Sequence, residues 1–234
     1  MKILSLKTPL PTALAILLLA SQAGLAQMPG ASSRTGINAA FVKLFGTAGA
    51  FSAKVNTRVL DPSQKELVRM PMEFAALDNK VRLEINLGQT QGKDFTASTI
   101  ATLKQAGMDR MISVFRPDKM ATYIIYPGVQ SYQIMPMPKA EAETFAKGFK
   151  LEKSALGKET IDGHACVKNK VVVQGDKGPV LEVTTWNATD LKDFPVQIGM
   201  RDNENTVLMG FSQVRFAKPD ASQFELPAGY SQMK

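Results

Sequence analysis

Histidine and cysteine are the side chains best suited to nucleophilic or metal chemistry, and this chain has one of each. His164 and Cys166 lie two positions apart in LGKETIDGHACVKNKVVV, residues 156–173. On a strand such residues share a face, so the imidazole could serve the thiol as a base. However, no third residue to orient the base and no oxyanion hole is marked nearby, and two ligands fall short of the usual four of a structural zinc site. We therefore predict a turn histidine and a strand cysteine in a protein that is not an enzyme and has no catalytic residue, bound metal or cofactor.

Methionine is the other residue type with possible chemistry. Twelve occur in 234 residues, and they include two Met-Pro-Met triplets, Met70-Pro71-Met72 and Met135-Pro136-Met137. The i, i+2 spacing on a strand points both sulfurs of a triplet the same way. Three interpretations stay open. The flexible thioethers could contact an apolar ligand of irregular shape, bind copper(I), or simply fill the core, with the prolines at bulges or edge strands.

The first 26 residues have the pattern of a cleavable export signal. Lys2 and Lys7 form a basic start, residues 13–20 an apolar core, and Gly24 and Ala26 a site for signal peptidase. The apolar run is far shorter than the roughly 18 to 20 residues that cross a bilayer. We predict an exported, periplasmic protein without a transmembrane segment, with a signal peptide at 1–26, a flexible leader at 27–36 and a single domain at 37–234.

Charge distribution argues against a nucleic-acid-binding protein, and cysteine content argues against a fold stabilised by internal disulfides. Loss of Lys2 and Lys7 with the signal lowers the formal charge from +7 to +5, and acidic and basic residues are mixed along the rest of the chain. A basic run with interleaved aromatics is missing from the sequence, so nucleic acid is not an expected partner. One cysteine cannot form an internal disulfide, so the fold depends on its hydrophobic core.

Hydrophobic periodicity predicts the elements. Apolar residues at i, i+4, i+7 and i+8 predict a short helix over 37–45, and alternation over 51–59, 68–76 and 81–87 predicts antiparallel strands with one apolar and one wet face. Further helices are expected at 95–106 and 138–148. Further strands are expected at 110–116, 120–126, 130–135, 166–174, 180–187, 194–201 and 206–216. The predicted fold is mainly β with α: a curled antiparallel sheet of about ten strands, an incomplete β-barrel, with three short helices as plug or lid.

Four segments, in order, resemble bacterial proteins with the outer-membrane lipoprotein carrier (LolA-like) fold. They are YPGVQSYQIMP at 126–136, LGKETIDGHACVKNKVVV at 156–173, FPVQIGMRD at 194–202 and DASQFELPAGY at 220–230, the last with an F-x-L-P-x-G-Y ending. The nearest resemblance is to a family of that fold without an assigned function, and it covers roughly residues 51–230. It implies a helical lid over an apolar cavity, and the characterised members of the wider fold carry lipoproteins or bind acyl chains.

The leading functional hypothesis is a non-enzymatic periplasmic protein that holds an acyl chain, a lipid or the lipid of a lipoprotein. Its partners would be a lipid or a lipidated protein, with the helices at 95–106 and 138–148 as movable cover. One alternative is an envelope protein-interaction module with a filled barrel; another is copper(I) handling by the methionines. The residues expected to line the cavity are Val55, Met70, Met72, Phe74, Leu83, Ile85 and Ile124.

Overall fold

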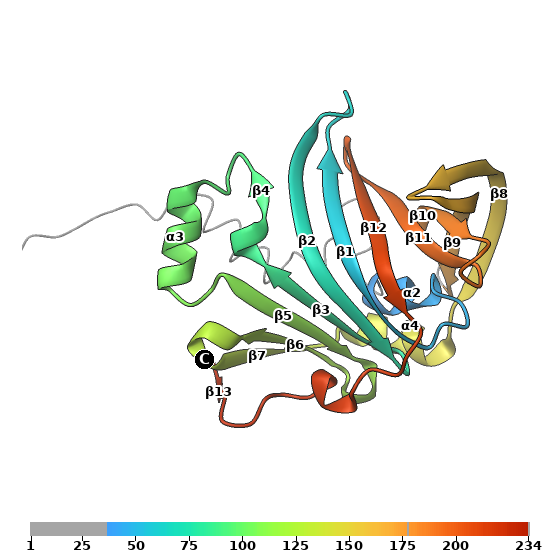
Figure 1. The fold of residues 1–234 in the computed structure, drawn as a ribbon. Coiled ribbons are helices and arrows are strands. Elements are labelled where there is room, and N and C mark those ends of the chain that lie inside the picture. Colours follow the sequence, from blue (N-terminus) through green and yellow to red (C-terminus); the bar gives the residue numbers. More distant parts are fainter. Residues whose placement is uncertain (1–36, 177, 234) are drawn as a thin grey trace, which may run out of the picture.

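A single large sheet organises the protein. The computed structural model describes residues 37–176 and 178–233. Its strands follow the order β13-β7-β6-β5-β3-β2-β1-β12-β11-β10-β9-β8, with β4 paired to β2 outside this path. Every pairing is antiparallel except that of β13 with β7. Figure 1 shows the sheet bending into a curl whose two ends, β7 with β13 and β8, do not pair with one another.

The strands are β1 (Ala50–Leu60), β2 (Glu66–Leu77), β3 (Lys80–Asn86), β4 (Gln91–Gly92), β5 (Arg110–Arg116), β6 (Ala121–Tyr126), β7 (Ser131–Pro136), β8 (Lys150–Ile161), β9 (His164–Gly175), β10 (Gly178–Ala188), β11 (Phe194–Asp202), β12 (Asn205–Arg215) and β13 (Ser231–Gln232). The α-helices are α2 (Ile37–Lys43), α3 (Ala97–Gln105) and α4 (Lys139–Lys147). Single 3₁₀ turns are η1 (Leu87–Gln89), η2 (Pro117–Lys119), η3 (Pro127–Val129) and η4 (Ala221–Phe224).

The predicted curled, mainly antiparallel sheet with three short helices is confirmed, but the strand count was too low. The prediction missed β8, a strand of twelve residues. Eleven of its twelve residues are exposed, so both faces of this strand are in contact with solvent. The segment KLEKSALGKETI therefore lacks the apolar alternation that would indicate a strand. The two-residue strands β4 and β13 were also missed. The predicted signal peptide and leader lie outside the described residues.

Tight turns set the register between neighbouring long strands. Asp78 and Asn79, between β2 and β3, both have left-handed backbones with φ of 49° and 65°. Asp162 and Gly163, between β8 and β9, have φ of 49° and 86°. Two successive left-handed residues match the right-handed twist of a hairpin, and Asp, Asn and Gly adopt that conformation most readily. These turns therefore hold the strands in the register that decides which side chains face into the curl.

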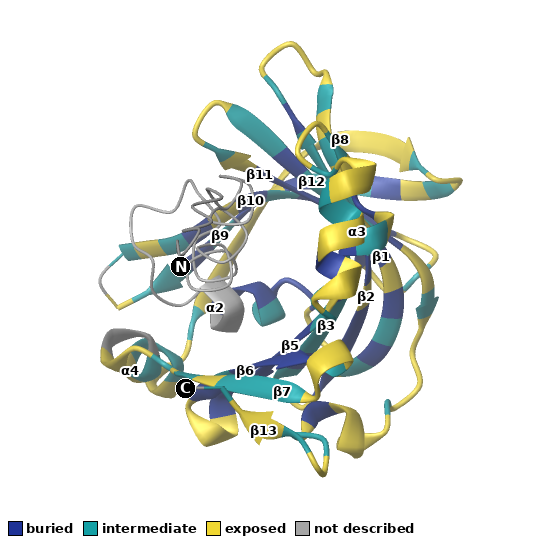
Figure 2. Ribbon diagram, turned by 90° about the vertical axis from the view of Figure 1, so that its left-hand side faces the viewer, coloured by how far each residue is buried: buried dark blue, intermediate teal, exposed yellow. Residues whose placement is uncertain are grey.

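Phenylalanine rings fill part of the interior of the curl. Phe41 of α2 and Phe45 just after it pack with four rings from the sheet, and the Phe45 centroid lies 4.9 Å from that of Phe51 and 5.3 Å from that of Phe74. Phe194 and Phe211 complete the group, with centroids 5.6 and 5.5 Å from Phe45. Figure 2, a view into the curl, shows α2 inside it. Of the three predicted helices, α2 is the one that acts as a plug.

The outer face of the sheet is also partly covered, which corrects the prediction of one wet face. Ala75 and Leu77 of β2, Ile112 and Val114 of β5, and Phe224 of η4 form a second buried cluster. The chain after β12 crosses the outside of β3 and β5 and then pairs with β7 (Figure 1). We call residues 216–233 the C-terminal strap. Phe224 of this strap packs against the outer face of the sheet and is 1% exposed. As a result, β5 and β6 are buried on both faces.

Helix α4 connects the two unpaired ends of the sheet, since it follows β7 and precedes β8. It is fastened to the β9–β10 hairpin by an ion pair of 2.6 Å between Lys147 Nζ and Asp176 Oδ2. A Cβ added to Gly175 would lie 2.9 Å from Thr144 Cγ2, so helix and hairpin are in close contact there. The opening between the ends of the sheet is therefore bridged by a helix rather than by strand pairing.

Candidate ligand-binding face

The residues predicted to line a cavity all fall on the inner face of the curl. Cross-strand pairs place Val55, Met72 and Ile85 in one row, which continues to Phe211 on one side and Met111 on the other. We call this row 2. Row 3 lies beside it and contains Ala53, Phe74, Leu83, Ser113 and Ile124. Row 1, on the other side of row 2, contains Ile198, Met209, Thr57 and Met70.

Burial divides this face into a filled part and a more accessible part. Val55, Phe74 and Ile124 are each 2% exposed, and Phe74 lies under the rings of Phe41 and Phe45. Met70 and Leu83 are half-buried and pack against the same core. The space beside Phe74 is thus occupied by the protein's own side chains. Whether any of the predicted residues contacts a ligand stays a prediction.

Seven members of these rows were not among the residues predicted to line a cavity, and three of the seven are Thr57, Met111 and Met209. Thr57 carries a hydroxyl and does not look like a cavity residue, although alternation places it on the same face as Val55 and Val59. Met111 and Met209 join rows 2 and 1 from β5 and β12. Neighbours along the chain cannot reveal such partners, because the pairing of β12 with β1 joins residues about 150 positions apart.

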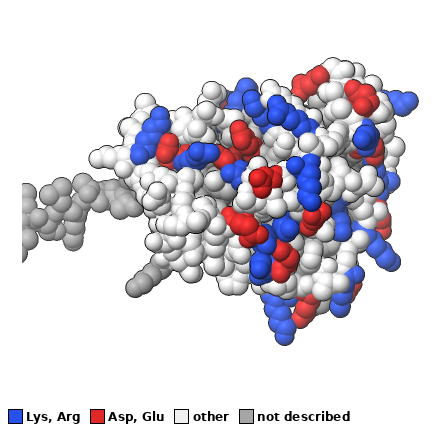
Figure 3. Space-filling view, turned by 60° about the horizontal axis from the view of Figure 1, so that its bottom comes forward, with Lys and Arg blue, Asp and Glu red and all other residues white. Residues whose placement is uncertain are grey.

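Rows 1 and 2 contain no charged residue. Ionised groups gather instead on the outer side of β3 and β5, where Glu84 Oε2 accepts a bond of 2.6 Å from Arg82 and Glu84 also pairs with Arg110. Figure 3 shows acidic and basic side chains intermingled on the face in view. The inner rows can therefore attract a ligand by burying apolar surface but not by ionic contacts.

The two Met-Pro-Met triplets do not come together through the sheet. Met70 and Met72 are on β2, whereas Met135 is on β7, with β3, β5 and β6 between them. On the side of β2 that faces away from β1, the pairing partner changes from β4 to β3, and Pro71 lies between these two ladders. A residue without a backbone N–H is tolerated at such a gap. Pro136 ends β7. The prolines thus occupy the irregular and edge positions expected from the core-filling interpretation.

His164 and Cys166 do not form a nucleophile and base. His164 Nδ1 lies 2.7 Å from Asp190 Oδ2, and Cys166 Sγ donates instead to the backbone oxygen of His164 at 3.3 Å. Burial is the main factor that raises the pKa of the Cys166 thiol above its ordinary value, and Cys166 is only 2% exposed. A buried thiol with a raised pKa is a poor nucleophile. This geometry agrees with the predicted turn histidine and strand cysteine.

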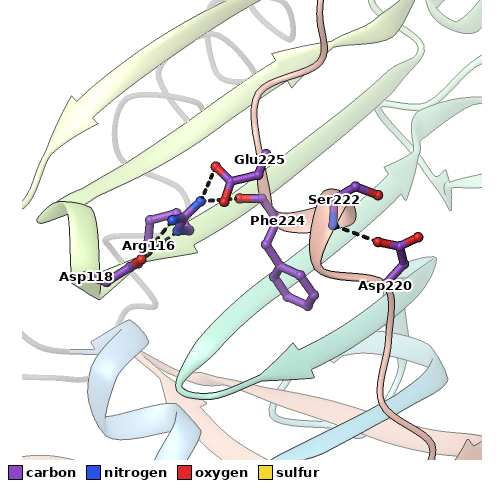
Figure 4. Close-up of polar contacts among 6 residues, drawn as sticks. All are labelled: Arg116, Asp118, Asp220, Ser222, Phe224 and Glu225. Atoms are coloured by element: carbon purple, nitrogen blue, oxygen red, sulfur yellow. Dashed lines mark hydrogen bonds and ion pairs between the residues drawn. The ribbon is translucent and has the colours of Figure 1, made fainter.

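An ion-pair network centred on the buried side chain of Arg116 joins the sheet to the C-terminal strap. The guanidinium of Arg116, 3% exposed, donates to Asp118 Oδ1 and Oδ2, to Glu225 and to the backbone oxygen of Phe224 (Figure 4). Hydrogen bonds to Asp118 are the main factor that raises the pKa of Arg116. The Asp220 carboxylate accepts from the Ser222 N–H at 2.9 Å and caps η4. Because each guanidinium nitrogen of Arg116 is directed at a protein acceptor, this cluster holds the fold together rather than binding a ligand.

Among residues 37–176 and 178–233, no group of three or more His, Cys, Asp or Glu side chains could hold a metal ion. Within the same residues, none of the helices has the length and hydropathy needed to cross a membrane.

The fold defines the protein as an open, curled antiparallel sheet with an apolar inner face. No family model matches the chain, and no curated protein matches it. Solved structures that do match include a LolA superfamily protein from Nitrosomonas europaea, with a TM-score of 0.41 and 10% identity over 81% of this chain and 96% of that one. LprF from Mycobacterium bovis has a TM-score of 0.39 and 14% identity over 86% and 100% of the two chains. LppX from Mycobacterium tuberculosis has a TM-score of 0.38 and 13% identity over 76% and 94%.

The resemblance to the LolA-like fold that the sequence motifs indicate is thus found again among solved structures. The features of this chain that bear on its function are the curled sheet and its uncharged inner rows.

Proposed function

We propose that this protein is an exported, non-enzymatic carrier that holds the hydrocarbon of a lipid or of a lipidated protein against the inner face of its sheet, in the periplasm. The observation that supports this most directly is the uncharged inner face, which runs through rows 1 and 2 across β11, β12, β1, β2, β3 and β5. Burying hydrocarbon contributes about 25 cal/mol for each Å² removed from water. A single acyl chain laid along such a face gains enough to be held without ionic contacts.

The half-buried residues on this face indicate where a ligand would enter. Met70, Leu83 and Met111 are partly exposed although each packs against the core. Flexible thioethers accommodate chains of different shape, because methionine has several low-energy rotamers and a polarizable sulfur. The ring cluster around Phe45 would form the inner end of the site, because α2 fills the curl there.

Lipid co-purification tests this proposal. The full chain would be exported in a bacterium, purified without detergent and extracted with organic solvent, and the extract would be analysed by mass spectrometry. We expect phospholipid or acylated peptide close to one molecule per protein. Leu83→Glu should remove it, because a carboxylate on the inner face has no cation to pair with.

Leu156→Glu is the matched control, since Leu156 lies on β8 and is 56% exposed. It should retain the lipid. A clean extract from the wild-type protein, together with failure to bind added lipid, would refute the carrier function.

A second function is favoured by one observation, the open edge at β8. Within the part of the chain that the structure describes, this strand pairs only with β9, whereas the opposite edge is covered by the strap through β13. An unpaired edge can add an extended segment of another protein. Three lysines (Lys150, Lys153, Lys158) and a bulge between Ala155 and Gly157 work against this, since both features discourage edge pairing. Capture of a periplasmic protein by a lipid-free preparation would support this module over the carrier.

A further inference from the structure

Thr57 is the one polar residue among the members of rows 1 and 2. The Thr57 hydroxyl oxygen is buried and has no hydrogen-bond partner among the described residues. Thr57 lies in row 1, directly between Met209 of β12 and Met70 of β2. The eight positions around it on this face of β12, β1 and β2 are all apolar: Val55, Val59, Val68, Met70, Met72, Val207, Met209 and Phe211.

Such a group is costly to leave unpaired. A buried hydroxyl without a partner destabilises a protein by about 1 to 3 kcal/mol, and most buried polar atoms in proteins do have partners. Core filling alone would be better served by valine, which has nearly the same shape without the hydroxyl. A hydrogen-bond partner from outside the described residues would offset this cost.

Water is a poor candidate for that partner. Buried waters usually make about three hydrogen bonds to polar groups that would otherwise be unsatisfied. The eight neighbours on the inner face offer no oxygen or nitrogen from a side chain, so a water bonded to Thr57 would have little else to bind. A carbonyl oxygen needs only one donor, and the hydrocarbon attached to it suits the apolar neighbours.

We infer that Thr57 is the polar anchor of the ligand site, and that its hydroxyl donates a hydrogen bond to the carbonyl oxygen of an ester-linked or amide-linked acyl chain. This inference rests on the proposed carrier function and specifies its ligand class. A free fatty acid fits less well, because its carboxylate would meet no cation in rows 1 and 2. Half-buried Met70 and the second thioether, Met209, can shift to admit the carbonyl.

Comparison of an ester lipid with its ether analogue tests the inference. The probes are dipalmitoylphosphatidylglycerol and the corresponding dihexadecyl diether, which lacks both carbonyl groups, and each would displace a fluorescent apolar dye from the full chain after export. We expect the wild-type protein to bind the ester roughly three- to tenfold more tightly, the gain of one hydrogen bond. Thr57→Val should bind both lipids equally, and Thr57→Ser should retain the preference.

Thr184→Val is the matched control, because Thr184 is half-buried in β10 and outside rows 1 to 3. It should keep the wild-type preference. If wild-type protein binds both lipids equally, or if Thr57→Val keeps the preference, the inference is wrong while the carrier function stands. If wild-type protein binds neither lipid, the carrier function fails and the inference fails with it.

The unliganded protein gives an independent readout. Thr57→Val removes an unsatisfied hydroxyl and keeps the side-chain shape, so lipid-free Thr57→Val should melt at the same temperature as the wild type or higher. A clear loss of melting temperature would show that the hydroxyl already has a partner in the free protein, and would overturn the inference.

Discussion

Arg116 Nη1 donates a hydrogen bond of 2.8 Å to the backbone oxygen of Phe224, a residue 108 positions later in the chain. The contact joins the end of β5 to the strap that crosses the outer face of the sheet. Arg116 is 3% exposed, while its partners Asp118 and Glu225 have side chains 44% and 56% exposed. Without Arg116, water could still solvate the two carboxylates, but the Phe224 carbonyl would lose its hydrogen-bond donor.

Removing this guanidinium should loosen the strap. We expect Arg116→Met to lower the free energy of unfolding by about 1 to 3 kcal/mol, the penalty for a buried acceptor that loses its donor. Denaturant titration followed by tryptophan fluorescence measures it. Arg69→Met, which removes an exposed pair with Glu66, should change stability by no more than about 0.5 kcal/mol. Equal effects of the two substitutions would contradict a structural role for Arg116.

Phe224 should be the main apolar anchor of the strap. It is 1% exposed and packs on Val114 and the other members of the outer cluster, so Phe224→Ala should cost about 3 to 5 kcal/mol. Phe216→Ala is the comparison, because that ring is 39% exposed, and it should cost less than about 1 kcal/mol. Limited proteolysis should cut the strap of Phe224→Ala first. Protection equal to that of the wild type would refute this anchor.

Acid should weaken the same network. Hydrogen bonds from Arg116 are the main factor that lowers the pKa of Asp118 below its ordinary value of 3.8. A carboxyl with a lowered folded-state pKa stabilises the protein above the unfolded-state pKa, and this contribution is lost as the pH falls through the folded value. Asp118→Asn should therefore be less stable than the wild type at pH 7, and the difference should shrink below about pH 4. Denaturant titrations across pH would detect this, and a difference independent of pH would contradict it.

Two glycines fix the end of α3 to the β6–β7 turn. A Cβ on Gly128 would overlap the backbone oxygen of Gly107, so one backbone would have to move. We expect Gly128→Ala to lower the free energy of unfolding by about 1 to 3 kcal/mol through overpacking. Gly210→Ala is the control, since its nearest contact would be at 3.9 Å, and it should be close to neutral. Equal thermal melting of both variants would argue against this contact.

Cys166 should be inert in the folded protein. Its burial and raised thiol pKa predict that iodoacetamide at pH 8 labels it only as fast as the protein opens. His164→Ala should not slow the labelling chemistry, because His164 Nδ1 is occupied by Asp190 rather than directed at the thiol. Rapid labelling of native protein that depends on His164 would instead revive a thiol-based function.

Much of the sheet could be predicted because burial on one face leaves a period of two in the sequence. Val55, Met72 and Ile85 follow that period, and the structure places them in one row. Leu151 and Leu156 of β8 do not follow that period, because β8 is exposed on both faces. This strand was therefore missed. The burial of Ile112 and Val114 on the outer face could not be predicted, because the strap that covers them lies about 110 residues further along the chain.

The sequence by itself therefore determined the fold class, the three helices and which residues face inward, because these depend on local periodicity and on turn residues such as Asp78-Asn79. Only the tertiary structure decided what each inward side chain meets. Phe74 meets the plug residue Phe45, and Thr57 meets two thioethers instead of a hydrogen-bond partner. The reason is physical: cross-strand register and the path of the strap bring together residues far apart in the chain, and no local pattern of hydrophobicity specifies such pairs.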